Sequence, residues 1–280
     1  MIKSVFVGLS LPVENYKKLG EVGANHLIVW LDSITSQKWP LLQKTGCELG
    51  ISFSAFEKED CPLDPLAKDK LREKIKRALK WRPREIWLDH FRFDGYWEST
   101  FAKAPVDKGY LVADTHKPCK WCRDKNRVKI IDDIAKEIKK LVRNKTKVGY
   151  FAVPYHLNRQ TKLVSELGQN HSILGKIFDM ASPMLYHRMI RKPVSYISKY
   201  VKYMHKLTQK PVLPIIQIKD MPDLPAGRQG DLQDKLSWNE IKAAYNEAKK
   251  KPSVGVSIFM WEHAVEKNKV GLIKELLSSK

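Results

Sequence analysis

Short apolar runs rich in β-branched residues alternate with amphipathic stretches along the whole 280-residue chain. Runs of this length and composition are typical of buried strands, and they predict strands at residues 4–9, 26–31, 48–53, 85–91, 147–153, 178–186, 212–218 and 254–261. Between them the apolar positions recur at helical spacing, which predicts helices at residues 14–23, 35–45, 64–80, 124–143, 160–176, 193–208, 238–250 and 269–277.

This alternation of strands and helices predicts a parallel sheet with right-handed crossovers. Eight such units in a chain of this length suit a closed barrel. A doubly wound open sheet is the alternative, but it usually carries a glycine-rich phosphate turn after its first strand, and residues 8–12 read Gly-Leu-Ser-Leu-Pro. We therefore predict that residues 1–280 form a single α/β domain, a (βα)8 TIM barrel. Long connections follow its fourth strand (93–123) and its seventh strand (219–237).

Composition narrows the class of protein further. An apolar share of 43% excludes wholesale disorder, and no apolar run approaches the roughly 20 residues of a membrane helix. The N-terminal residues read as a strand rather than a signal peptide, so the chain as given is expected to be cytoplasmic, or secreted if its N-terminus has been trimmed. The net charge of +20 favours an anionic partner. However, the lysines spread along all the helices without a nucleic-acid motif, so nucleic acid is not expected to be that partner.

Polar and aromatic side chains follow the carboxyl ends of the predicted strands, where barrels of this type carry their active sites. Such a mixture is typical of sugar chemistry, because hydrolysis of a glycosidic bond needs two carboxyl groups and aromatic rings stack on sugar faces. The candidates from the fourth strand onward are Asp89, His90, Arg92, Asp94, Trp97, Tyr155, His156, Tyr186, His187, Gln217, Trp261 and Glu262.

Four segments carry a resemblance to a known family. Residues 86–95, Ile-Trp-Leu-Asp-His-Phe-Arg-Phe-Asp-Gly, resemble the Leu-Asp-Tyr-Ile-Arg-Tyr-Pro strand of a family of glycoside-hydrolase-like TIM barrels, with Leu88 to Asp94 matching this motif. Residues 179–186 are similar to the sixth-strand Asp-x-x-x-Pro-Met-x-Tyr element of that family, residues 214–217 to its Pro-x-x-Gln, and residues 257–262 to the end of its eighth strand. The matches fall on four strands in the right order.

The resemblance implies a catalytic or substrate-contacting role for Asp89, with Arg92 orienting it or gripping the substrate. It also implies that Tyr186 and Gln217 contact substrate. Asp179 opens its strand, so we expect it to lie at the opposite end of the barrel and to be structural.

The chain departs from this family pattern at two positions, where His90 replaces the tyrosine and Asp94 the proline. The family-18 chitinases are a more distant likeness, which shares the sixth-strand Met-x-Tyr and an eighth-strand tryptophan. Their fourth-strand Asp-x-Asp-x-Glu is absent from residues 89–93. The substrate-assisted mechanism of those enzymes is therefore not expected here.

The second carboxyl group stays open at this point. A carboxyl group that acts as an acid needs poorly solvated surroundings, and Glu262 directly follows an apolar pair of residues. Asp94, Glu98 and Asp220 are the other choices. The residues that we expect to bind substrate are His90, Arg92, Trp97, Tyr155, Tyr186, His187, Gln217 and Trp261.

A cysteine–histidine cluster lies in the long connection after the fourth strand. His116, Cys119 and Cys122 fall within seven residues, a spacing that suits tetrahedral Zn²⁺. Cys61, after the third strand, is the candidate fourth ligand, because adjacent barrel loops are neighbours. Such a zinc would be structural. Unligated thiols and a redox Cys-x-x-Cys pair are the alternatives, and no organic cofactor is expected.

Taken together, the residues predict a glycoside hydrolase that cleaves O-glycosidic bonds in a polysaccharide or oligosaccharide, and the net charge favours an anionic one. A non-catalytic barrel that binds glycan is one alternative. A metal-dependent hydrolase or deacetylase, using His90, His156, His187 or His263, is another. The sequence leaves the oligomeric state open.

Overall fold

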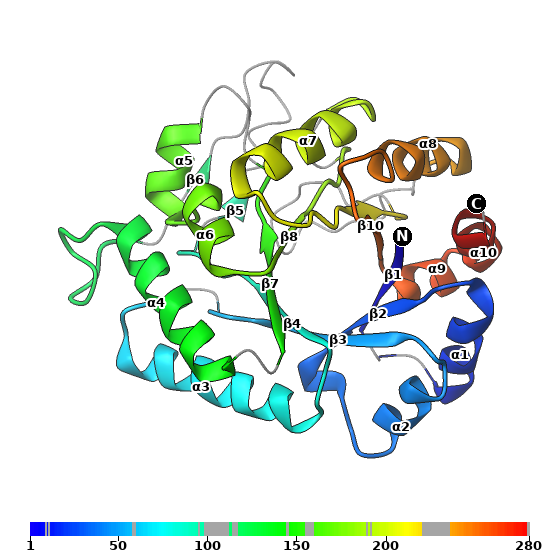
Figure 1. Ribbon diagram of the computed structural model, residues 1–280, viewed down its shortest axis with the longest axis horizontal. Helices are drawn as coiled ribbons and strands as arrows, with labels where there is room; N and C mark the ends of the chain where they lie inside the picture. The colour runs from blue at the N-terminus through cyan, green and yellow to red at the C-terminus, as the bar shows by residue number, and fades with distance from the viewer. Residues whose placement is uncertain are drawn as a thin grey trace.

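The computed structural model describes residues 1–8, 10, 12–57, 60–94, 96–97, 112–113, 117–143, 146–154, 160–188, 190, 192–219 and 236–278. Its core is an eight-stranded parallel barrel ringed by helices (Figure 1). In spatial order the strands are β8 (Met180–Pro183), β7 (Lys147–Ala152), β4 (Glu85–Asp89), β3 (Glu48–Ser54), β2 (His26–Trp30), β1 (Ile2–Val7), β10 (Gly255–Phe259) and β9 (Ile215–Gln217).

Two isolated bridges join the outer strands of this order and bring the barrel to near closure. Ala181 pairs with Val212 and Met184 with Ile215, both in the parallel sense. The predicted (βα)8 barrel is thus confirmed. The first long connection adds a short antiparallel ribbon, β5 (Tyr96–Trp97) with β6 (Val112–Ala113).

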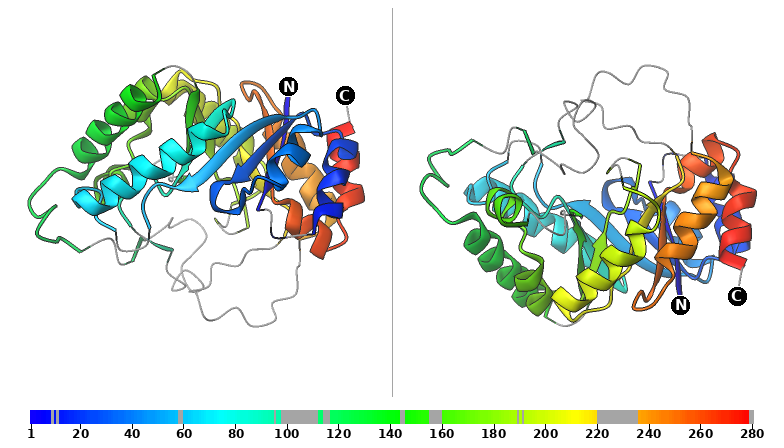
Figure 2. Two further views of the ribbon diagram at one scale, coloured as in Figure 1. Left: turned by 90° about the horizontal axis from the view of Figure 1, so that it is seen from below. Right: turned by 90° about the horizontal axis from the view of Figure 1, so that it is seen from above.

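The helices lie on the outside of the strands. Their bounds are α1 (Val13–Lys17), α2 (Lys38–Gln43), α3 (Pro65–Lys80), α4 (Arg127–Val142), α5 (Gln160–Leu167), α6 (His171–Ile177), α7 (Tyr196–Thr208), α8 (Trp238–Ala248), α9 (Trp261–Glu266) and α10 (Val270–Ser278). Side views show α3 and α4 side by side, and α10 beside the N-terminal helical segment, where it contacts the 3-10 helix Lys18–Val22 that follows α1 (Figure 2). No described helix is both long enough and apolar enough to cross a membrane.

Side-chain caps explain where three of these helices begin. The carboxylate of Asp64 accepts the Leu66 N–H at the start of α3, and Asn126 accepts the Lys129 N–H at the start of α4. Ser237 caps α8 in the same way. These short polar side chains satisfy backbone donors that the first helical turn leaves unpaired.

Most predicted elements begin or end a few residues away from the observed ones, and three predictions differ more substantially. The single helix predicted at 160–176 is two helices, α5 and α6, because Gly168 between them has a φ of +72° and a Cβ there would lie 2.6 Å from the Arg127 carbonyl oxygen. The strand predicted at 178–186 is only four residues long. The last strand ends at Phe259, so Trp261 begins a helix rather than ending a strand.

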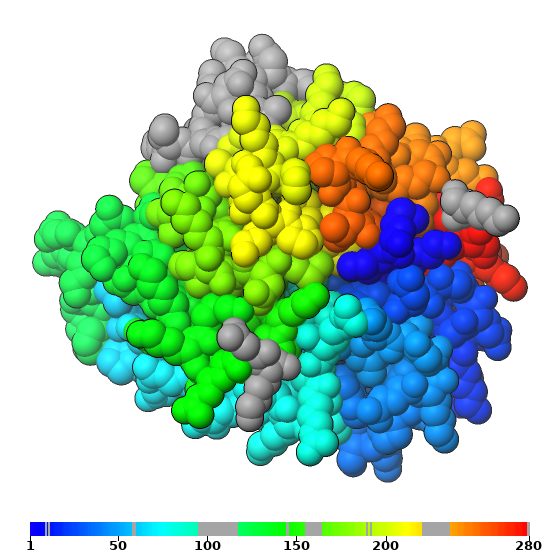
Figure 3. Space-filling view, in the orientation of Figure 1, coloured from blue at the N-terminus to red at the C-terminus, as the bar shows by residue number. Residues whose placement is uncertain are grey.

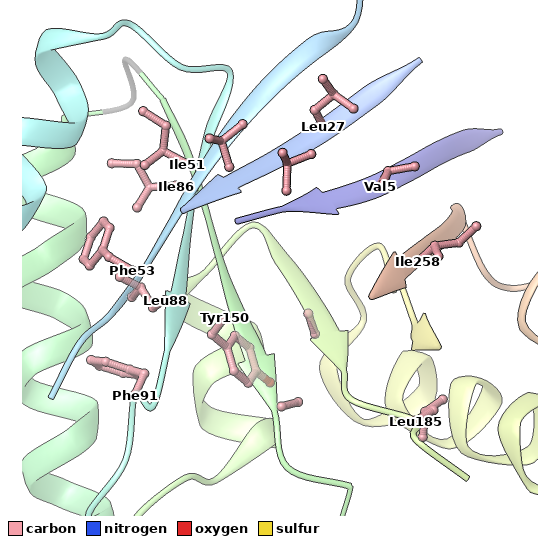
Figure 4. Close-up of a cluster of buried hydrophobic side chains, with 14 of the residues drawn as sticks. Val5, Leu27, Ile51, Phe53, Ile86, Leu88, Phe91, Tyr150, Leu185 and Ile258 are labelled. Carbon is pink, nitrogen blue, oxygen red and sulfur yellow. The ribbon is translucent and has the colours of Figure 1, made fainter. Parts of the chain in front are cut away.

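Side chains alternate between two cores along each strand, as the two-residue period of a strand requires. The outward set packs beneath the helices and includes Val5, Leu27, Ile51, Ile86 and Ile258 (Figure 4). The inward set fills the barrel and consists of Phe6, Ile28, Trp87, Phe151, Met180, Leu213 and Ile215, with Tyr186 above them.

The barrel floor is polar. His26 on β2 contacts Ser4 on β1 through one ring nitrogen, at 2.8 Å, and Glu85 on β4 through the other. Ser257 on β10 donates to Ser4. All four side chains are buried and lie near the strand starts, so they tie β1, β2, β4 and β10 together across the barrel. Figure 3 shows this end of the molecule, with the N-terminal residues in dark blue beside the segment before β10 in orange.

Asp179 is structural, as predicted. Its carboxylate accepts a hydrogen bond from the Val148 N–H at 2.8 Å and forms an ion pair with Lys139, also at 2.8 Å. It therefore ties the start of β8 to β7 and to α4.

The Trp87 side chain fills the centre of the barrel. Its ring is fully buried and stacks on Phe151 at 5.6 Å with an interplanar angle of 6°. Glycines flank it on both neighbouring strands: a Cβ would lie 3.1 Å from the ring at Gly50 and 2.5 Å at Gly149. The indole fits between β3 and β7 because these two positions carry no side chain.

We therefore predict that Gly149→Ala destabilises the fold by about 1–3 kcal/mol, because the added methyl group overlaps a ring that has no space to move into. Chemical denaturation measures the free energy of unfolding. Gly271→Ala on α10 is the control, since a Cβ there has no atom within 4 Å, and it should lose no stability. Equal stability of the two variants would contradict the packing of Trp87.

Candidate active site

The fourth strand delivers Asp89 to the mouth of the barrel, meaning its carboxyl-terminal end. Asp89 follows Trp87 by two residues and so shares its inward direction, but it is partly exposed. Its Oδ1 accepts the His90 N–H at 2.8 Å, and its backbone oxygen accepts the Ala55 N–H from the end of β3. His90 has a φ of +46°, so the chain turns sharply away directly after the carboxylate.

Tyr186, from the connection after β8, lies within electrostatic reach of Asp89. Burial, and secondly the charge of Asp89, raise the pKa of Tyr186 well above its ordinary value. The phenol therefore stays protonated and is a hydrogen-bond donor at every physiological pH. The structure thus brings together a carboxylate and a buried donor that the sequence predicted separately.

Gln217 ends β9 on the inward side of the barrel and is fully buried. Its Nε2 donates to the Lys219 carbonyl at 3.1 Å. Its Oε1 is buried and has no hydrogen-bond partner among the described residues. A buried acceptor without a partner costs about 1–3 kcal/mol, and a donor such as a sugar hydroxyl would remove that cost.

An aromatic surface surrounds these polar groups. Phe259, at the end of β10, lies 5.6 Å from Tyr186 and 5.1 Å from Phe6 between ring centroids, and Phe6 lies 6.3 Å from Trp30. Phe259 and Trp30 are partly exposed. Neither ring is among the residues predicted from the sequence. The signal that could have found them is their place as the last inward residue of a strand, which is also the place of Asp89.

The turn after β4 holds Arg92 and Asp94 on its solvent side. Phe91 and Phe93, which alternate with them along the chain, are fully buried, and the Phe93 N–H donates to the Leu167 carbonyl at 2.8 Å. Arg92 donates to the Phe93 carbonyl at 3.1 Å, and Arg92 and Asp94 are both partly exposed. Asp94 is therefore a carboxyl group on the same turn as Asp89.

Glu262 lies on the opposite side of the barrel, because β10 is four places from β4 in the strand order. Its side chain is buried, and its Oε2 accepts the Gly8 N–H at 3.0 Å. Its Oε1 is buried without a hydrogen-bond partner in the described part of the chain. A Cβ on Gly8 would lie 3.4 Å from that Oε1, so the carboxyl group sits directly against the end of β1.

Two predicted substrate contacts lie elsewhere. Trp261 is fully buried in the outer core, among side chains such as Ala264 and Leu272, and cannot stack on a sugar. The predicted substrate contact of Trp261 is therefore corrected. Because β10 ends at Phe259, Trp261 is the first residue of α9 and does not end a strand at the mouth. His187 is also buried, and its Nε2 lies 2.8 Å from Glu240 on α8.

Several candidates fall outside the described residues: His116, Tyr155, His156, Glu98 and Asp220. The backbone of Trp97 is described as part of β5, but its side chain is not. Within the described ranges, the mouth holds no group of three histidines, cysteines or carboxylates close enough to share a metal ion.

Glu240 anchors the connection that carries Tyr186. Arg188 donates to both carboxylate oxygens, at 2.7 and 2.5 Å, and His187 contacts one of them. The Arg188 hydrogen bonds, and after them the His187 contact, lower the pKa of Glu240 to about 2 despite partial burial. Because the folded-state pKa is depressed, this stabilisation is present above the ordinary pKa near 4.5 and is lost as the pH falls from there towards 2.

We predict that Glu240→Gln lowers the free energy of unfolding by about 1 kcal/mol at pH 7, a modest loss because the ionised side chain is partly screened by solvent. At pH 2.5 the loss should be much smaller, because most of the stabilisation from the ionised Glu240 has already disappeared at that pH. Urea denaturation at the two pH values measures the difference. Glu266→Gln, which removes an exposed ion pair with Lys219 at 3.4 Å, is the control and should change little at either pH. A Glu240→Gln loss that is the same at both pH values would contradict the ionic anchor.

Comparisons with known proteins add the following. No family model matches the chain, and no curated protein matches it in sequence. Solved structures match its fold. A family GH18 chitinase from Cycas revoluta in complex with allosamidin is 10% identical, with 97% of this chain and 99% of that one covered and a TM-score of 0.60. The spore cortex-lytic enzyme SleL of Bacillus megaterium is 11% identical, with 92% and 70% covered and a TM-score of 0.59.

A different kind of enzyme also has this fold. The D-psicose 3-epimerase of Clostridium cellulolyticum is 12% identical, with 99% of this chain and 97% of that one covered and a TM-score of 0.53. Identities this low show the fold alone. The resemblance to glycoside-hydrolase-like TIM barrels, with a likeness to family-18 chitinases, is therefore confirmed at the level of the fold. Any activity must be argued from the site.

Proposed function

We propose that this protein hydrolyses O-glycosidic bonds in a polysaccharide or oligosaccharide at the mouth of its barrel. The observation that carries the proposal is the inward Asp89 carboxylate at the mouth, within electrostatic reach of the buried Tyr186, whose ring lies beside the partly exposed Phe259. Chitinases and a cortex-lytic enzyme among the structural neighbours support the same class of reaction.

Each group at the mouth has a role in this proposal. Asp89 contacts the reacting sugar as nucleophile or base, and Tyr186 donates a hydrogen bond to it or to the substrate. The Gln217 Oε1 accepts a hydrogen bond from a sugar hydroxyl. Trp30 and Phe259 offer apolar faces on which a sugar ring stacks.

Glu262 and Asp94 are the two described candidates for the second carboxyl group. The buried Glu262, with one unpartnered oxygen, has the poorly solvated surroundings that suit an acid. Asp94 is closer along the chain but more exposed. In retaining enzymes the two carboxyl groups are about 5–5.5 Å apart, and in inverting enzymes about 6.5–9.5 Å. A structure with a bound oligosaccharide would identify the partner.

We predict that Asp89→Asn reduces kcat on soluble oligosaccharides by about 10²–10⁴-fold, because the uncharged amide cannot act as nucleophile or base. Release of reducing ends from a panel of neutral and anionic oligosaccharides, chitin fragments included, measures the loss. Asp32→Asn is the matched control, since Asp32 is exposed and paired with Arg77 of α3. An Asp89→Asn variant that folds and turns over normally would overturn the proposal.

We also predict that Tyr186→Phe lowers kcat by about 10²-fold with little change in KM, because removal of one placed donor acts mainly on the transition state. Steady-state kinetics with the same oligosaccharide separates the two constants. A change confined to KM would mean that Tyr186 only binds substrate.

A barrel that binds glycan without cleaving it is the second candidate. The hydrogen bond that Glu262 accepts from Gly8, on the opposite wall of the barrel from Asp89, favours it, because one oxygen of this carboxyl group is already bound to the backbone. In that case the wild-type chain would bind oligosaccharides without turnover, and Asp89→Asn would weaken binding in calorimetry.

The charge of +20 supports an anionic glycan as the substrate. Attraction between exposed charges is screened by salt. KM for an anionic oligosaccharide should therefore rise with ionic strength more steeply than KM for a neutral one. Equal salt dependence would remove the anionic substrate from the proposal.

A further inference from the structure

Three cysteines from two different connections meet at one point on the carboxyl-terminal side of the barrel. Cys61 lies between β3 and α3, whereas Cys119 and Cys122 lie just before α4. Their three sulfur atoms all lie within 4.8 Å of one another. All four cysteines of the chain are in the described part of it, and none forms a disulfide.

The spacing of the sulfurs fits a tetrahedral metal site. Zn–S bonds are about 2.3 Å long, so two thiolates on one tetrahedral zinc ion lie about 3.8 Å apart. The Sγ atoms of Cys119 and Cys122 are 3.7 Å apart. Cys61 needs to move by less than about 1 Å to complete three corners of the same tetrahedron.

Backbone donors point at two of the sulfurs, which is a second and independent observation. The Trp121 N–H donates to the Cys119 Sγ at 3.4 Å, and the Leu63 N–H donates to the Cys61 sulfur. In both cases the donor lies two residues after the cysteine. Hydrogen bonds of this kind stabilise the negative charge of a thiolate, the form of cysteine that binds metal.

Because the three cysteines are largely shielded from solvent, the negative charge of their thiolates needs a partner of opposite charge nearby. Cys61 and Cys122 are buried and Cys119 is partly buried. Three thiolates this close would repel one another in a poorly solvated place unless a cation lay between them. A soft divalent ion with a preference for tetrahedral sulfur ligands meets that requirement.

We propose that Cys61, Cys119 and Cys122 bind one Zn²⁺ ion, which fixes the connection after β3 to the segment that leads into α4. The fourth coordination position belongs to solvent or to a further side chain. His116 is the sequence candidate, and it lies outside the described residues. The site is structural, because its ligands lie in the segments that lead into α3 and α4 rather than at Asp89.

The metal content of the purified protein tests this directly. The wild-type chain, prepared with thiol reductant and dialysed without chelator, should hold about one zinc ion per chain by plasma mass spectrometry. Cys61→Ser and Cys119→Ser should each lose most of it. Cys47→Ser is the matched control and should keep its zinc, because Cys47 is buried elsewhere and donates to the Ala24 carbonyl at 3.3 Å.

A second measurement covers variants that fail to fold. Cobalt(II) added to the metal-free wild-type protein should produce a thiolate-to-cobalt charge-transfer band, and zinc should then abolish it. Zinc should also protect three of the four thiols from alkylation. Neither readout depends on glycan hydrolysis, so the metal site and the proposed function succeed or fail separately.

Two results would overturn the proposal. One is a wild-type protein without zinc in which cobalt gives no charge-transfer band and all thiols react equally with and without metal. The other is a Cys119–Cys122 disulfide that persists in excess reductant and blocks metal uptake.

Discussion

The packing of one indole ring organises this barrel. Trp87 occupies the interior between β3 and β7, stacked on Phe151, and it fits there because Gly50 and Gly149 leave room on both sides. A ring of this size excludes water from the middle of the barrel and leaves no space for a shift in strand register, since a one-residue slip would place a side chain where a glycine is needed. Asp89 is the next inward residue of β4 after Trp87 and ends the strand, so a fixed position of Trp87 also fixes Asp89 at the mouth.

The candidate residues at the mouth are held in two ways: some stand on strands, and others stand on connections that are fixed to a helix. Asp89 and Gln217 stand on strands, so their positions follow from the sheet itself. Tyr186 stands on a connection, and the buried contact between His187 and Glu240 holds that connection against α8. The cysteine cluster would hold two further connections in the same way. Groups that need precise placement are thus carried by strands or tied to helices.

The two departures from the family pattern have different consequences. His90 takes the place of a tyrosine, and in this structure it is an exposed residue with positive φ at a sharp turn. Its backbone N–H, rather than its ring, makes the contact with Asp89. Asp94 replaces a proline and places a second carboxyl group on the same turn. Asp89 therefore ends its strand as the family motif implies, but an imidazole and a carboxyl group follow it where the motif has a phenol and a proline ring.

The sequence by itself determined the features that depend on local order along the chain. Its strand and helix periods determined the barrel, and the position of Asp89 at the end of an apolar run determined its place at the mouth. Tertiary structure decided what depends on contacts between distant segments. It put Trp261 in the outer core, because β10 ends two residues earlier than its apolar pattern does. It also brought Trp30 and Phe259 to the same side of the barrel as Tyr186. Such contacts depend on strand register and barrel closure, which no local pattern encodes.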